Sequence, residues 1–227
     1  MVYIKHLHIY TSRFVENLAY NLQNILKRTM ECSVYVRQLT PADVKKLKKN
    51  EYLMLISPQS TVSLSSLTVL RPNTYFIYQT EQLNTKERAA KFHNNEAMFK
   101  LFNNAYQIFD YSRDNMLLYS EKYNKVPMFL PFISGIDANA NANATTNTIS
   151  SNKTIDVLFY GTLNQRRYII INVLKQLMPK LNIVVEEVLF GKQLQEKIKQ
   201  SKIVLNIHNY EHATLETARI MEAMQYE

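Results

Sequence analysis

The sequence contains no long apolar stretch and no leader-like start. None of its apolar runs approaches the roughly 20 residues that a membrane-spanning helix needs. The first ten residues interrupt their apolar positions with Lys5, His6 and His8, which is not the pattern of a secretory signal peptide. We therefore expect a soluble protein without a membrane span, located in the cytoplasm.

Cysteine is nearly absent. Cys32 is the single cysteine, so no internal disulfide can form, which agrees with a reducing compartment. A packing position at a strand edge accounts for Cys32 better than catalysis does, because no base is placed beside it in the sequence. The five histidines show no ligand spacing backed by cysteines. We expect neither a metal nor a cofactor.

Glycine is also scarce, with three residues in the whole chain, so a glycine-rich phosphate loop is excluded. Hydrophobic residues make up 46% of the chain, with 15 tyrosines and 10 phenylalanines, which is typical of folded cores. The net charge of +8 is compatible with nucleic acid, an acidic membrane surface or phosphorylated small molecules as partners.

The first half of the chain alternates strand-like and helix-like segments. Strands are expected at residues 2–10, 32–39, 52–56, 74–78 and 107–110, with helices between most of them. Thr40, Pro41 and Asp43 form a typical helix start. Residues 59–70 are either a loop or a short helix. The alternation predicts right-handed crossovers and a mostly parallel sheet.

A tract rich in Asn, Ala, Thr and Ser separates the two halves. Residues 138–154 show no apolar periodicity and cannot build a core, so the domain boundary belongs here. The pattern then restarts, with strands expected at 155–160, 182–189 and 202–207 and helices at 168–177, 192–199 and 213–224. We predict an α/β protein with two Rossmann-like βαβ domains, at residues 1–134 and 154–227, joined by a linker at 135–153.

The stretch IDVLFYGTLNQRR, at residues 155–167, carries the clearest chemical signal. An apolar strand ends at Gly161, which permits a sharp turn, and Thr162 or Asn164 can then cap the next helix. Arg166 and Arg167 add two positive charges to the first turn of that helix, where cations are unfavourable unless an anion compensates them. Either a phosphate ligand binds there, or both arginines point into water.

Polar residues at two other strand ends are further candidates, because ligands of open α/β sheets bind outside the carboxyl ends of the strands. Glu81 follows the strand at 74–78, in a polar group with Thr80 and Gln82. It is either a catalytic base or an ordinary loop carboxylate. His208 follows the strand at 202–207, where it either contacts a ligand or packs on the surface.

Three segments carry a resemblance to a known family: residues 130–137, 159–167 and 201–224. They are similar, in this order, to the interdomain segment, the donor-diphosphate loop, and the donor-sugar and ribose site of GT-B-fold glycosyltransferases that use nucleotide sugars. The likeness covers mainly the last third of the chain. That family normally continues beyond the Glu-Ala-Met triplet, so the resemblance implies a donor domain that is incomplete at its C-terminus.

The resemblance also implies roles for individual residues. Gly161, Thr162, Arg166 and Arg167 would hold the donor diphosphate, and Glu222 would accept hydrogen bonds from the ribose. Glu211 would lie near the transferred sugar, with Glu216 as a competitor for that role. His208 and Glu81 are the other catalytic candidates, on the strength of their places at strand ends. The spacing from Glu211 to Glu222 is wider than the commonest one in the family.

The function expected from this likeness is metal-independent transfer of a sugar from a nucleotide sugar to an acceptor that the sequence does not reveal. Positive groups at the diphosphate and carboxylates near the anomeric carbon would stabilise the transition state. Two alternatives stay open. One is a non-catalytic binding or assembly module derived from such an enzyme, and the other is a nucleic-acid-binding protein, although no recognition helix or aromatic motif for nucleic acid appears.

Overall fold

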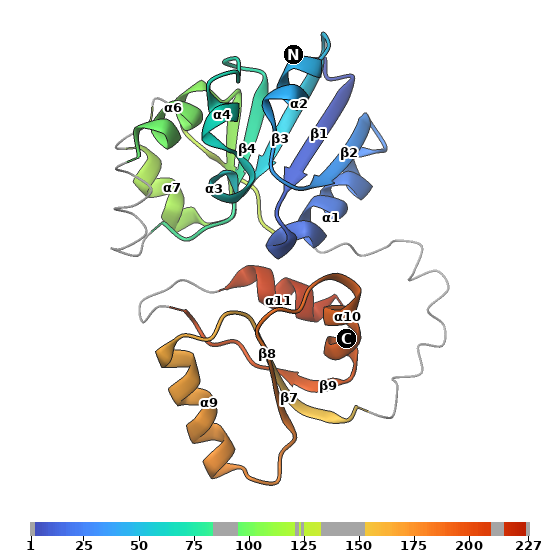
Figure 1. The fold of residues 1–227 in the computed structure, drawn as a ribbon, viewed down its shortest axis with the longest axis vertical. Helices are drawn as coiled ribbons and strands as arrows, with labels where there is room; N and C mark the ends of the chain where they lie inside the picture. The colour runs from blue at the N-terminus through green and yellow to red at the C-terminus, as the bar shows by residue number, and fades with distance from the viewer. Residues whose placement is uncertain are drawn as a thin grey trace. The chain divides into compact units, whose positions relative to one another are not determined.

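The computed structural model describes residues 3–83, 95–120, 123, 125–132, 153–209 and 216–225. The chain divides into two compact units, Met1–Ile133 and Ser134–Glu227. Each unit is an α/β structure with its own parallel sheet, as predicted (Figure 1). Within the described ranges, no helix is both long and apolar enough to cross a membrane.

The first unit contains a six-stranded sheet in the order β2-β1-β3-β4-β5-β6, and every neighbouring pair is parallel. Its strands are β1 (His6–Thr11), β2 (Glu31–Val36), β3 (Glu51–Ile56), β4 (Tyr75–Gln79), β5 (Gln107–Asp110) and β6 (Met128–Phe129). The first strand therefore lies between the second and the third. The chain goes from β1 to β2 in one direction along the sheet and from β2 to β3 in the other direction. Right-handed crossovers then place the helices of these two connections on opposite faces of the sheet.

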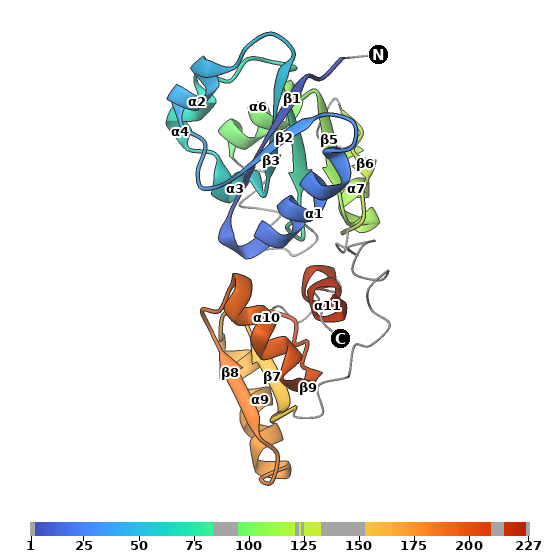
Figure 2. The ribbon, with the colours of Figure 1, turned by 90° about the vertical axis from the view of Figure 1, so that its right-hand side faces the viewer.

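Helices cover both faces of this sheet, with α1 on one face and α2, α4 and α6 on the other (Figure 2). The helical segments are η1 (Arg13–Val15), α1 (Glu16–Leu26), α2 (Pro41–Lys46), α3 (Pro58–Thr61), α4 (Leu64–Leu67), α6 (Glu96–Asn104) and α7 (Arg113–Ser120). The predicted start of α2 is confirmed, because Thr40 and Asp43 form a complete capping box. The sequence allows a loop or a short helix at residues 59–70, and the structure has two short helices there, α3, which begins at Pro58, and α4.

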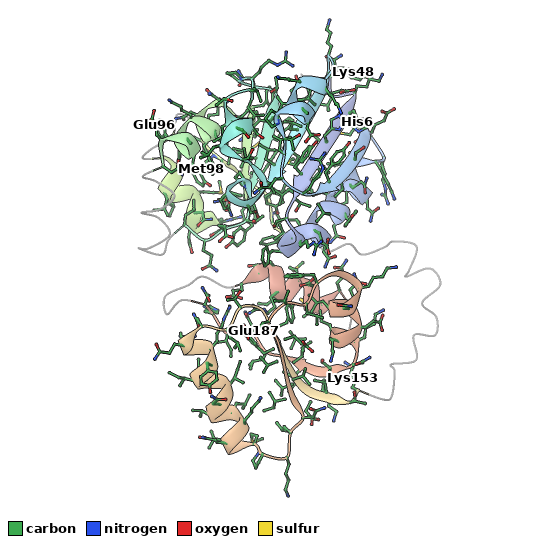
Figure 3. The ribbon with its side chains drawn as sticks, viewed as in Figure 1. His6, Lys48, Glu96, Met98, Lys153 and Glu187 are labelled. Carbon is green, nitrogen blue, oxygen red and sulfur yellow. The ribbon has the colours of Figure 1, made fainter. Side chains whose placement is uncertain are left out.

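The core of the first unit is strongly aromatic. Tyr75 and Ile77 of β4 pack with Phe102 of α6 and Tyr119 of α7, all less than 2% exposed. Met98 of α6 belongs to the same cluster (Figure 3). The hydroxyl of the buried Tyr75 donates to the backbone oxygen of Leu101 at 2.7 Å, so burial leaves this polar atom paired.

The second unit contains a three-stranded parallel sheet in the order β8-β7-β9. Its elements are β7 (Ile155–Tyr160), α9 (Gln165–Leu177), β8 (Ile183–Glu186), α10 (Gly191–Lys199), β9 (Ser201–Val204) and α11 (Thr217–Met224). Alternate residues of β7 face different helices: Leu158 packs with Leu194 of α10, whereas Phe159 packs with Ile171 of α9. The two helices accordingly lie on opposite sides of the sheet (Figure 1).

Candidate functional site

The turn after β7 is the centre of the candidate site. Gly161 has a φ of +118°, a backbone conformation that residues other than glycine rarely adopt. Its N–H donates to the backbone oxygen of Glu186 at 2.9 Å. Asn164 is the N-cap of α9, because its side chain accepts from the backbone N–H of Arg167 at 2.9 Å. The helix begins at Gln165, three residues before the predicted start, so both arginines lie in its first turn.

The side chain of Arg167 points into the protein. The residue is 4% exposed, and its Nε and Nη1 donate to the backbone oxygens of Ile207 at 2.9 Å and Thr162 at 2.8 Å. Its Nη2 donates to Oε1 of Glu216 at 2.7 Å. Burial lowers the pKa of Arg167, and the Glu216 carboxylate opposes this change. Arg167 thus joins the Gly161 turn to the segment after β9, and its expected contact with a diphosphate stays a prediction.

Arg166 is half-buried, and its Nη1 donates to the backbone oxygen of His208 at 3.0 Å. Within the described residues this is the single hydrogen bond of its guanidinium. His208 lies four residues beyond Val204, the last residue of β9, and contributes its backbone to the site. The amide of Asn164 adds a third connection, donating to the backbone oxygen of Asn209 at 2.6 Å.

This position is a topological switch point of the sheet. β7 lies between β8 and β9, and the chain leaves β7 toward β8 and later returns to the other side to form β9. Loops that leave two neighbouring strands in opposite directions open a crevice at the carboxyl ends of the strands, where ligands of open α/β sheets bind. The arginines of the first turn of α9 connect the segments that follow β7 and β9.

Two carboxylates from α11 and its N-cap complete the site. Glu216 accepts from Arg167, from the backbone N–H of Asn209 at 3.1 Å, and from Nη1 of Arg219 at 2.5 Å. Oε2 of Glu222 accepts from the hydroxyl of Tyr160 at 3.1 Å. Burial, and then the charge of Glu222, raise the pKa of Tyr160 above its usual range.

Arg219 is the site residue that the sequence analysis missed. Its Nη1 also donates to Oδ1 of Asn206 at 2.8 Å, and its Cζ lies 5.3 Å from the centroid of the Tyr160 ring. A signal existed in the sequence, because Arg219 is three residues from both Glu216 and Glu222 in an expected helix. Residues at that spacing share one helix face.

The remaining predicted residues are not all brought together. Thr162 is exposed and contributes its backbone oxygen to Arg167. Glu211 lies outside the described residues. Glu81 belongs to the first unit, where its backbone oxygen accepts from Nδ2 of Asn115 at 2.8 Å, so its role as a base remains a prediction.

Positive side chains outnumber carboxylates among the described residues at the turn. The guanidiniums are those of Arg166, Arg167 and Arg219, and the carboxylates are those of Glu216 and Glu222. Across the part of the chain that the structure describes, no group of three or more His, Cys, Asp or Glu side chains is arranged to hold a metal ion. Guanidinium groups beside the first turn of a helix are suited to an anion.

The chain has no match in three comparisons with known proteins. No protein-family model, curated protein or solved structure matches it.

Proposed function

We propose that the protein is a glycosyltransferase that takes a sugar from a nucleotide-sugar donor, with two GT-B-like domains and the donor bound by the second unit. The observation that supports this proposal is the excess of guanidinium groups at the switch point after β7, beside the first turn of α9. A diphosphate carries negative charge that would balance these guanidinium groups, and the N-terminal turn of a helix favours phosphate.

The chemistry assigned to the site is electrostatic. When the bond between the sugar and the diphosphate breaks, negative charge grows on the leaving group. Positive side chains already fixed by the protein stabilise that charge without rearranging during the reaction. Arg166 is the residue best placed for this role, since it is half-buried and has donors that bind no described protein atom.

Donor binding by purified protein tests the proposal. We expect at least one UDP- or GDP-linked sugar to raise the melting temperature and to bind in calorimetry. Arg166→Ala should weaken that binding by about 1.5 to 3 kcal/mol, the value of a lost charge-assisted hydrogen bond. Arg28→Ala, an exposed arginine of the first unit, removes the same charge far along the chain and should leave the affinity unchanged.

Three results would redirect the interpretation. If no UDP- or GDP-linked donor stabilises the protein, the glycosyltransferase proposal is wrong. If donor binds but no sugar transfer or donor hydrolysis is detected with any acceptor, the non-catalytic module is favoured. Binding to DNA or RNA that falls steeply with salt would favour the nucleic-acid-binding alternative.

A further inference from the structure

Arg219 lies directly against the glycine turn. A Cβ atom added to Gly161 would be 2.9 Å from Nη2 of Arg219, a distance that real Cβ atoms essentially never show. The guanidinium therefore occupies the space that the absent side chain leaves open, although it comes from α11, almost 60 residues later in the chain. A group bound at this turn would meet Arg219 as well as the backbone.

Among the described ion pairs, Arg219 shares its carboxylate with a second arginine. One carboxylate, Glu216, lies between two guanidiniums, at 2.7 Å from Nη2 of Arg167 and 2.5 Å from Nη1 of Arg219. The side chains of Arg167 and Arg219 are 5% and 10% exposed, so water reaches little of either one. Buried charge is costly unless it is paired, and an anionic ligand would supply the missing partner.

Arg219 also has hydrogen-bond donors to offer. Its Nε is buried and has no hydrogen-bond partner, while the protein bonds described for its guanidinium all use Nη1. Arg219 also lines a cavity of about 310 Å³ between β9 and α11, whose other lining residues include Asn206, Val204 and Ile220 but not Gly161. Unsatisfied buried donors are rare in folded proteins, and a bound anion beside Arg219 would account for this one.

We propose that Arg219 is a direct ligand of a pyrophosphate group at the Gly161 turn, and that Glu216 sets the strength of this site by neutralising part of its charge. The inference deepens the proposed function, because the pyrophosphate would belong to the nucleotide-sugar donor. It assigns a ligand-binding role to α11 in addition to the first turn of α9.

Isothermal titration with inorganic pyrophosphate tests the site without a nucleotide. Arg219→Gln should weaken binding at least tenfold, as expected for a lost charge-assisted hydrogen bond. Glu216→Gln keeps the size of the side chain and an oxygen acceptor but removes its charge, so it should tighten binding, on the order of threefold. Arg28→Gln is the charge-matched control in the first unit and should bind as the wild type does.

The two variants should change the pyrophosphate affinity in opposite directions, weaker for Arg219→Gln and tighter for Glu216→Gln. This separates ligand binding from a structural role, because damage to the fold would weaken binding in both variants. Circular dichroism and thermal unfolding identify a variant that has not folded, and Arg219→Lys then replaces Arg219→Gln, with weaker binding still expected because a lysine lacks the planar fork. Pyrophosphate affinity unchanged in a folded Arg219 variant, or lost in Glu216→Gln, would overturn the inference.

Failure of this inference differs from failure of the proposed function. If pyrophosphate binds through Arg219 but no nucleotide sugar stabilises the protein, the anion site stands and the glycosyltransferase proposal falls. If a nucleotide sugar binds equally well to wild type and Arg219→Gln, the proposed function stands and the role of Arg219 falls.

Discussion

Arg166 and Arg167 are adjacent in the sequence and have different environments in the structure. The sequence placed both at a helix start and left open whether they bind an anion or point into water. Arg167 does not point into water, since each of its three guanidinium nitrogens, Nε, Nη1 and Nη2, donates to a protein oxygen. Arg166 has one such bond. The difference depends on which direction each side chain takes from the helix.

Replacing Arg167 should therefore reduce the stability of the protein more than replacing Arg166 does. Arg167→Ala would leave Glu216 with Arg219 as its remaining arginine partner and two backbone oxygens without donors, so we expect the free energy of unfolding to fall by about 3 kcal/mol. Urea denaturation followed by circular dichroism measures this change. Arg166→Ala is the control and should cost less than about 1 kcal/mol. Equal stability of the two variants would show that the buried bonds of Arg167 contribute little.

A buried carboxyl group in the first unit is expected to make its stability depend on pH. Asp110 is 0% exposed at the end of β5, and its Oδ1 accepts from the backbone N–H of Ser112 at 2.8 Å. Burial raises the pKa of Asp110 from 3.8 to about 7, although hydrogen bonds from Ser112 and Asn115 oppose the rise. A folded pKa above the unfolded one means that this group contributes stability below about pH 4 and loses that contribution as the pH rises through 7.

Asp110→Asn should remove this dependence, because an amide does not ionise. The free energy of unfolding of the wild type, minus that of the variant, should fall between pH 4 and pH 8 by on the order of 4 kcal/mol, from the shift between 3.8 and about 7. Chemical denaturation at several pH values measures it. Asp114→Asn, an exposed carboxylate in α7, is the control and should leave the profile as it is. A difference that does not vary with pH would contradict the prediction.

At the scale of elements, agreement with the sequence was best where local chemistry is strong. The strands at Gln107–Asp110 and Ile155–Tyr160 match their expected ranges, and the helix start at Thr40 is confirmed. The expected strands at 32–39 and 202–207 are wrong at their ends, because β2 stops at Val36 and β9 at Val204. Pairing with β1 and β7 sets these ends, and a pattern of apolar residues does not contain the pairing.

The start of α9 offers a test at this scale. Asn164→Ala removes both the N-cap acceptor and the hydrogen bond that the side-chain amide donates to Asn209, so it should destabilise the protein by about 1 to 2 kcal/mol. Asn164→Asp keeps an acceptor for the N–H of Arg167 and loses the amide donor. The aspartate variant should therefore lose less stability in thermal unfolding, and a loss equal to that of alanine would show that the bond to Asn209 dominates.

At the scale of the whole molecule, both sheets place their first strand between the second and the third. The corresponding strand ends of the first unit carry Thr11 and Ser57, which are uncharged and at most 4% exposed. The second unit instead has guanidiniums from two helices there. The same topology thus carries a cluster of guanidiniums in one unit and a polar, buried strand edge in the other, because residues outside the strands decide the charge.

The sequence by itself determined the α/β class, the parallel sheets and the position of a positively charged turn at Gly161, since these depend on apolar periodicity, turn residues and local charge. The tertiary structure decided which arginines are available to a ligand. It buried Arg167 against Ile207 and Glu216 and brought Arg219 to the glycine turn. Contacts between residues some 40 to 60 positions apart depend on strand order and helix docking, which local sequence patterns do not contain.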